Sequence, residues 1–92
     1  MNYEIELAPE AIEEIKSLRK AGDKVTLKKI DSLLGELEKH PYTGTGLPKP
    51  LRENRTGQWS RRISQKHRLI YRVIDDQMIV FVLSTYGHYD DK

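Results

Sequence analysis

Two runs of alternating polar and apolar residues, Trp59–Ile63 and His67–Val73, constrain the fold of this 92-residue chain more than any other feature. Three polar residues, Ser64–Lys66, join the two runs. Alternation with period two places successive side chains on opposite faces of a strand, and a short polar join between two such runs is typical of a hairpin. We therefore predict an antiparallel β-hairpin that turns Trp59 and Tyr71 towards a hydrophobic core.

The N-terminal half predicts a short strand and two helices. Residues Asn2–Leu7 alternate, and Pro9 then suits the first turn of a helix that Gly22 ends. Asp23 is a good N-cap for a second helix, which Pro41 closes. So short a link makes the helices antiparallel, an αα-hairpin with one apolar side. Acidic residues near the start of the first helix suit the positive end of its dipole: Glu10, Glu13 and Glu14.

The C-terminal half predicts strands after a loop rich in proline and glycine, Pro41–Pro50. A strand is expected near Leu51, the hairpin follows, and residues 75–76 form a turn. The near-continuous apolar run Gln77–Tyr86 fits an interior strand buried on both faces. The order strand, helix, helix and then three or four strands predicts an α+β fold. In that fold the αα-hairpin packs on one face of a mostly antiparallel sheet.

Charge is distributed unevenly along the chain. Residues 1–40 carry seven basic and nine acidic side chains, whereas residues 41–92 carry nine and five. Between Leu47 and Arg72 a single acid, Glu53, accompanies eight basic residues: Lys49, Arg52, Arg55, Arg61, Arg62, Lys66, Arg68 and Arg72. A sheet with this charge repels itself unless a polyanion neutralises it, which predicts RNA binding. The alternative is a solvated strand face that discourages edge pairing.

Composition excludes several function classes. The absence of cysteine excludes disulfides and thiolate metal sites, and His40, His67 and His88 lack metal-ligand spacing, so we expect no metal and no cofactor. No apolar run is long enough to span a bilayer and the N-terminus lacks a leader, so we expect a cytoplasmic protein without a membrane partner. The length predicts one domain, residues 1–92, with a modest core.

Several motifs together resemble one known family. The loop T-G-T-G-L-P-K-P-L is followed by G-x-W-S-R-R-I, by H-R-L-I-Y-x-V and by a closing His88-Tyr89. This combination resembles the YoeB/Txe branch of the RelE-like toxins over residues 41–74 and the closing pair, while the helical half matches in pattern only. The resemblance implies the RelE-like βααβββ fold. It also implies a ribosome-dependent mRNA endonuclease, the toxin of a type II toxin–antitoxin system.

The resemblance implies partners as well. A cognate antitoxin would neutralise the toxin by wrapping its basic surface, and operator DNA would be bound only through that antitoxin. The mRNA would be met in the A site of the 30S or 70S ribosome. Toxins of this family often form homodimers, so a homodimer is expected as an option.

Matching the family's motifs residue by residue gives the expected catalytic residues. The active-site arginine falls on Arg68, and the C-terminal pair on His88 and Tyr89. Cleavage would use the ribose 2′-OH as nucleophile, with Arg68 stabilising the phosphorane and His88 acting as general acid. Tyr89 would stack on a base or hydrogen-bond the phosphate. The family's catalytic glutamate would fall on Lys49, which reverses the charge at the position of the general base.

Lys49 leaves three interpretations open. It could be a base whose pKa falls to near neutrality, a phosphate clamp, or a disabling change, and His88 could itself act as the base. Glu53 is the nearest acid in sequence, but four residues along an extended strand is ~13 Å, too far for a simple substitute. We favour a phosphate-clamping Lys49 with weakened activity. His67 is expected to be structural, pairing across the hairpin.

The residues expected to line the RNA groove are basic: Arg52, Arg61, Arg62 and Lys66, with Arg61 and Arg62 as alternatives for one motif position. Three functions remain in view. The first is a YoeB-like endonuclease, the second a non-catalytic protein of the same fold that binds antitoxin or RNA without cleaving, and the third a small basic-sheet RNA-binding module. Mutation of His88 or Arg68 separates an enzyme from a binder.

Overall fold

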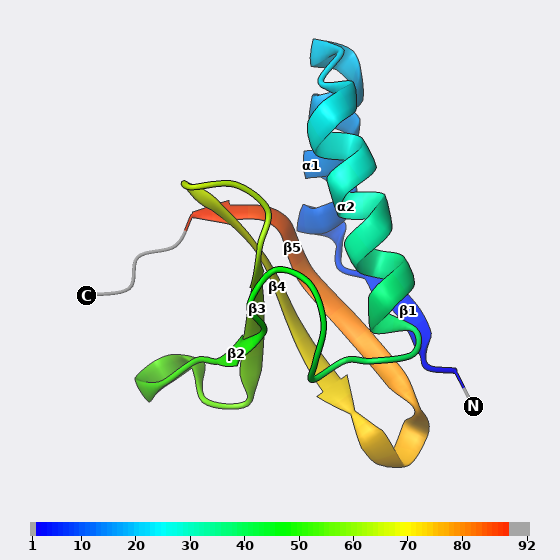
Figure 1. Ribbon diagram of the computed structural model, residues 1–92, viewed down its shortest axis with the longest axis vertical. Helices are drawn as coiled ribbons and strands as arrows, with labels where there is room; N and C mark the ends of the chain where they lie inside the picture. The colour runs from blue at the N-terminus through cyan, green and yellow to red at the C-terminus, as the bar shows by residue number, and fades with distance from the viewer. Residues whose placement is uncertain (1, 89–92) are drawn as a thin grey trace.

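Within the residues that the structure describes, the fold consists of two helices and a five-stranded sheet. Figure 1 shows their arrangement. The computed structural model describes residues 2–88, apart from the side chains of Glu53 and His88. In chain order the elements are β1 (Glu4–Leu7), α1 (Pro9–Ala21), α2 (Lys24–Leu37), β2 (Lys49–Pro50), the 3-10 turn η1 (Glu53–Arg55), β3 (Gln58–Arg62), β4 (His67–Ile74), the 3-10 turn η2 (Asp75–Gln77) and β5 (Ile79–His88).

The sheet has the order β1-β5-β4-β3-β2. β1 runs parallel to β5, and the three remaining pairs are antiparallel. This confirms the α+β fold with a mostly antiparallel sheet. β5 is an interior strand, as predicted, but the expectation that it is buried on both faces is wrong. Val80 and Val82 are buried against the helices, whereas Phe81 and Leu83 on the other face remain partly exposed, because the helices cover one face.

Gly22 ends the first helix and Asp23 begins the second where the sequence predicts, but α2 ends at Leu37, four residues before the Pro41 that was expected to close it. Gly22 adopts a left-handed conformation (φ 73°) that ends α1, and its N–H donates to the last carbonyls of that helix. Asp23 caps α2 by accepting from the Thr26 N–H at 3.1 Å. The helices lie side by side over one sheet face (Figure 1). Their apolar side chains join those of β4 and β5 in one buried cluster: Ala11, Leu33, Leu37, Leu69, Tyr71, Val80 and Val82.

The predicted hairpin is formed by β3 and β4. Trp59 is paired with Tyr71 and Arg61 with Leu69. Tyr71 is fully buried and Trp59 packs against the core, which confirms the inward placement of both rings. The alternation of the two runs therefore determines which arginines face the core and which face away from it.

Several element boundaries differ from the prediction. The strand expected near Leu51 is β2, two residues earlier, and η1 follows it. The segment that contains Glu53 is therefore not extended, and the ~13 Å separation assumed for an extended strand does not apply. β1 begins at Glu4 rather than Asn2. β5 begins at Ile79, because Met78 takes a left-handed conformation (φ 55°) after η2.

Neither helix combines the length and the apolar content that crossing a bilayer requires, judged over the residues that the structure describes.

Candidate active site

The sheet face that the helices leave uncovered carries two neighbouring arginines. Leu69 and Tyr71 point into the core, so Arg68, which alternates with them, faces the other way. Arg62 lies directly opposite Arg68 on β3, and Gly87 lies opposite it on β5. Directly opposed residues have Cβ atoms about 4.5–5.5 Å apart, and like charges in such a pair repel. Two like charges therefore lie on opposed positions of this face.

Lys49 adds a third cation to the same face. It pairs with Ser60, which precedes Arg62 by two positions on β3 and so shares its face. Lys49 and Arg62 are exposed, whereas Arg68 is 9% exposed. Three strands thus contribute one cation each, the innermost of them largely removed from water. The exposure of Lys49 favours a phosphate clamp over a buried base.

The end of β5 lies beside this group of cations. His88 is the last residue of β5 and pairs with His67, next to the pair of Arg68 with Gly87. The backbone that carries His88 therefore leaves the sheet next to Arg68. The side chain of His88 and the whole of Tyr89 lie outside the described residues, so their expected roles stay predictions.

The two remaining cations of the expected RNA groove are exposed and lie in different places. Lys66 is in the corner between β3 and β4, one residue before His67, and therefore close to the end of β5. Arg52 follows β2 and accepts through its carbonyl from the Arg55 N–H at 3.1 Å. Both side chains face solvent, as contact with a phosphate backbone requires.

Arg61 is not available to RNA, which corrects its place among the groove residues. It is fully buried on the core side of β3. Its guanidinium donates to the Tyr71 hydroxyl at 3.3 Å and to Glu36 Oε1 at 3.0 Å. It also donates to three loop carbonyls: Thr43 at 2.7 Å, Thr45 at 3.3 Å and His40. These contacts match the five N–H donors of an arginine, so Arg62 is the member of the pair that faces out.

The contacts of Arg61 fix the loop that leads to Lys49. Glu36 Oε1 also accepts from the Thr45 N–H at 2.8 Å, and the Tyr71 hydroxyl donates to the Pro41 carbonyl at 2.7 Å. Hydrogen bonds from Thr45, together with the nearby guanidinium of Arg61, lower the pKa of Glu36. A buried arginine and a carboxylate of α2 thus hold the loop against the sheet.

Gly46 allows the same loop to run beside β3. Its carbonyl accepts from the Arg62 N–H at 2.6 Å, and its φ of 88° lies in the left-handed region. A Cβ at this position would meet the Arg62 carbonyl oxygen at 3.0 Å. Glycine is therefore required here for both backbone conformation and space.

A second carboxylate fixes the start of the loop. Asp75 accepts from the hydroxyls of Tyr3 at 2.7 Å and Tyr42 at 2.5 Å. The Tyr42 ring packs edge-on against Trp59 with centroids 5.0 Å apart. Burial, followed by the bond to Asp75, raises the pKa of Tyr42 to about 12. Asp75 therefore ties the N-terminal segment, the loop and η2 together.

The Asp75 carboxylate is expected to stabilise the fold in a pH-dependent way. Hydrogen bonds from Tyr42 and then Tyr3 lower its pKa in the folded protein. A depressed folded-state pKa contributes stability above the unfolded value, and this is lost as the pH falls through the folded value. In urea unfolding, the free energy of unfolding of the parent should be larger than that of Asp75→Asn above about pH 4. The difference between the two free energies should become small below that pH. Asp76→Asn is the control, and a difference independent of pH would contradict the prediction.

The ring of His67 contacts the corner of the hairpin, where its Nδ1 lies 3.5 Å from the Ser64 Oγ, and it also contacts β5. It stacks on Tyr86 of β5, with centroids 3.5 Å apart and planes 15° apart. Its backbone closes the corner of the hairpin, because the Ile63 N–H donates to the His67 carbonyl at 3.0 Å. His67 therefore bonds across the hairpin corner, as predicted, and its ring also packs on β5.

The sequence did not predict the contacts of three carboxylates that hold the loop and β5 in place. Glu14 was expected at the positive end of the dipole of α1, but its carboxylate reaches β5 instead. Glu36 and Asp75 carry no local signal, because their partners come from other elements. Among the side chains that the structure describes, no cluster of three His, Asp or Glu residues is placed to hold a metal ion.

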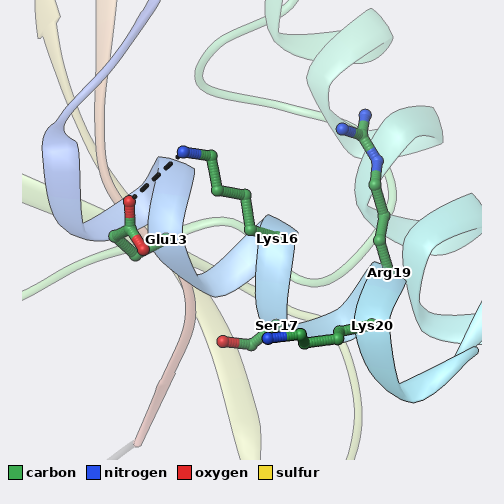
Figure 2. Close-up of a pocket in the computed structure, with 5 residues that line it drawn as sticks. All are labelled: Glu13, Lys16, Ser17, Arg19 and Lys20. Atoms are coloured by element: carbon green, nitrogen blue, oxygen red, sulfur yellow. Dashed lines mark hydrogen bonds and ion pairs between the residues drawn. The ribbon is translucent and has the colours of Figure 1, made fainter.

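A surface depression lies elsewhere, on α1 (Figure 2). None of the residues expected in the active site is among those that line it: Glu13, Lys16, Ser17, Arg19 and Lys20.

Comparison with protein families gives a match over most of the chain. A family model for the YoeB-like toxin of bacterial type II toxin-antitoxin systems matches residues 7–89. Toxin RelK of Mycobacterium tuberculosis is 44% identical over 69 residues, which are 75% of this chain and 79% of that protein. Toxin YoeB of Escherichia coli K12 is 45% identical over 58 residues, 63% of this chain and 69% of that one.

Solved structures agree with this match. A YoeB/ParE toxin from Agrobacterium tumefaciens superposes with a TM-score of 0.87 at 28% identity, covering 94% of this chain and 99% of that one. The toxin in a heterotetrameric YoeB-YefM toxin-antitoxin complex from Staphylococcus aureus gives 0.81 at 36% identity, covering 97% and 100%. A YoeB dimer from the same organism gives 0.82 at 36% identity, with the same coverage.

Proposed function

We propose that this chain, which belongs to the YoeB-like toxins of bacterial type II toxin-antitoxin systems, inhibits translation by cutting mRNA on the ribosome. The observation that carries the proposal is the convergence of Lys49, Arg62 and Arg68 on one sheet face, next to the strand end that carries His88. A cationic face of this kind suits a substrate whose reacting group is a phosphate.

The reaction we propose needs no external co-reactant. The ribose 2′-oxygen attacks the adjacent phosphorus, the bond from phosphorus to the 5′-oxygen breaks, and the products are a 2′,3′-cyclic phosphate and a 5′-hydroxyl. The 2′-OH loses its proton, and the leaving 5′-oxygen gains one from a general acid. We assign the acid to His88, whose ordinary pKa lies near working pH. Tyr89 stacks on a base or hydrogen-bonds the phosphate.

Arg68 is the group we assign to the phosphorane. A guanidinium can hold two phosphoryl oxygens at once. Arg68 is 9% exposed, and a cation shielded from water interacts more strongly with developing negative charge than one in bulk solvent. A phosphate bound between Arg62 and Arg68 would offset part of the repulsion between these two opposed cations.

Lys49 takes the role of a phosphate clamp in this proposal. Its exposure and its place on the same face as Arg62 support that role. The 2′-OH proton then passes to solvent rather than to a carboxylate, so cleavage is slower than with a glutamate at this position. Exposed Arg52, Arg62 and Lys66 hold the flanking phosphates of the mRNA.

The proposed toxin function also implies binding partners. We propose that a cognate antitoxin covers the basic face, because relatives from Staphylococcus aureus were solved as a YoeB-YefM complex. A homodimer is proposed from the YoeB dimer of that organism. Operator DNA is then bound through the antitoxin, and the toxin acts in the cytoplasm, where ribosomes translate.

A second candidate function is a binder that no longer cleaves. Lys49, at the position where the resemblance places a glutamate, is the observation that favours it. The comparison of the parent with Lys49→Glu on programmed ribosomes separates the two. Cleavage by the parent supports an enzyme, whereas cleavage by Lys49→Glu alone identifies a disabled toxin.

Growth arrest tests the proposed function in cells. Induction of the parent chain in Escherichia coli is expected to stop growth, and His88→Gln is expected to restore it. His40→Gln, which changes an exposed histidine outside the site, is the matched control and should still arrest growth. Arrest that persists in His88→Gln would contradict a catalytic role for that residue.

A further inference from the structure

Between Val82 and Gly87, β5 departs from regular pairing with β4. Val82 pairs with Tyr71 and Gly87 pairs with Arg68, so five steps along β5 lie against three steps along β4. Two residues of β5 are therefore extra, and the backbone N–H groups around them lose their regular partners on the neighbouring strand. Bulges of this kind bend a strand and redirect the side chains that follow.

Glu14 of α1 supplies the missing hydrogen-bond partners. Its Oε1 accepts from the Thr85 N–H at 2.7 Å and from the Tyr86 N–H at 3.1 Å. The Ser84 hydroxyl donates to both carboxylate oxygens, at 3.0 and 2.9 Å, and the Thr85 hydroxyl lies 3.3 Å from Oε1. One carboxylate thus takes up the donors of three consecutive residues.

These contacts are strong because they are charged and shielded. Ser84 is 7% exposed and Thr85 is fully buried. Buried N–H groups without partners are costly, and hydrogen bonds to a carboxylate are about twice as strong as those between neutral groups. α1 packs against β5, so the carboxylate is presented from a rigid support.

Tyr86 is held both through its backbone and through its ring. Its backbone N–H is bound to Glu14, while its ring stacks on His67 of β4. The backbone then continues to Gly87 opposite Arg68 and ends β5 at His88. The segment that carries His88 is therefore fixed by one residue of α1 and one residue of β4.

We propose that Glu14 is a positioning residue for the active site: it holds the bulged end of β5 and thereby fixes the backbone that carries His88 beside the pair of Arg68 with Gly87. The inference rests on the proposed nuclease function. Glu14 touches neither substrate nor reacting atoms and acts through the strand. A 1 Å displacement of a catalytic group can lower a rate about 10²-fold.

The test compares Glu14→Ala and Glu14→Gln with the parent in single-turnover cleavage on programmed ribosomes. Glu14→Ala should lower the rate at saturating ribosomes about 10²-fold with little change in the concentration for half-saturation. Glu14→Gln keeps an acceptor oxygen and should restore the rate to within a few-fold. Glu13→Ala is the matched control, because Glu13 is an exposed acid of the same helix that pairs with Lys16 at 3.5 Å (Figure 2).

Amide hydrogen exchange gives a readout independent of cleavage. The Thr85 and Tyr86 amides should exchange faster in Glu14→Ala than in the parent, while amides of the α2 core keep their protection. Unchanged exchange, an unchanged rate in Glu14→Ala, or no rescue by Glu14→Gln would each overturn the proposal. If the parent itself fails to cut, the proposed function is wrong, and the exchange rates alone then decide whether Glu14 holds the strand end.

Discussion

Arg61→Ala is expected to lower the free energy of unfolding by about 3 kcal/mol, the lower end of the usual cost of removing one partner of a buried ion pair, because the Glu36 side chain is 29% exposed. Arg61 is fully buried, and its loss removes the guanidinium that donates to three loop carbonyls and one of the donors to Glu36. Since small domains are stable by ~5–15 kcal/mol, this is a large fraction of the total. Urea unfolding followed by circular dichroism measures the change.

The neighbouring residue provides the control for Arg61. Arg62→Ala removes the same side chain from an exposed position and should change stability by no more than ~0.5 kcal/mol. Arg61→Lys should not rescue Arg61→Ala, because an ammonium group cannot supply five donors in a planar fork. A loss below about 1 kcal/mol in Arg61→Ala would show that the loop does not depend on this side chain.

Arg68→Ala is expected to lower the rate of mRNA cleavage by about 10²–10³-fold, as removal of one preorganised donor to an oxyanion does. The effect should fall on the rate at saturation, because Arg68 is assigned to the charge that develops in the phosphorane. Arg72→Ala is the matched control: Arg72 lies four residues along β4 on the same face, is exposed, and pairs with Gln58. Equal rates for the two variants would remove Arg68 from the catalytic group.

The adjacent residues Arg61 and Arg62 lie on opposite faces of the sheet because the side-chain period of a strand is two. The alternation around Trp59 already places Arg61 on the inward face. The family motif leaves Arg61 and Arg62 as alternatives for one groove position. Arg61 is buried and Arg62 is exposed, so Arg62 is the residue that can occupy the groove position. Here the alternation of the strand predicts the outward residue, whereas the family motif does not.

Local signals predicted the end of α1, the start of α2 and the β3–β4 hairpin, because capping and alternation act over a few residues. The end of α2 at Leu37 carries no such signal, since the proline expected to close the helix lies four residues further on. The carboxylates that hold the site could not be predicted in this way. Glu14 lies 71 positions from Thr85 and Glu36 lies 25 positions from Arg61, so only the folded chain brings them together. The bulges of β5 were missed for a related reason: a continuous apolar run shows no break in alternation to mark them.

Cleavage through the ribose 2′-OH is tested with two mRNAs bound in the A site of programmed ribosomes. One is all ribose, and the other carries a single 2′-deoxynucleotide immediately 5′ of the cut. We predict that this chain cuts the first mRNA, leaving a 2′,3′-cyclic phosphate, and leaves the second intact at that position. Cleavage of the 2′-deoxy mRNA at the same position, or no cleavage of the ribose mRNA, would contradict it.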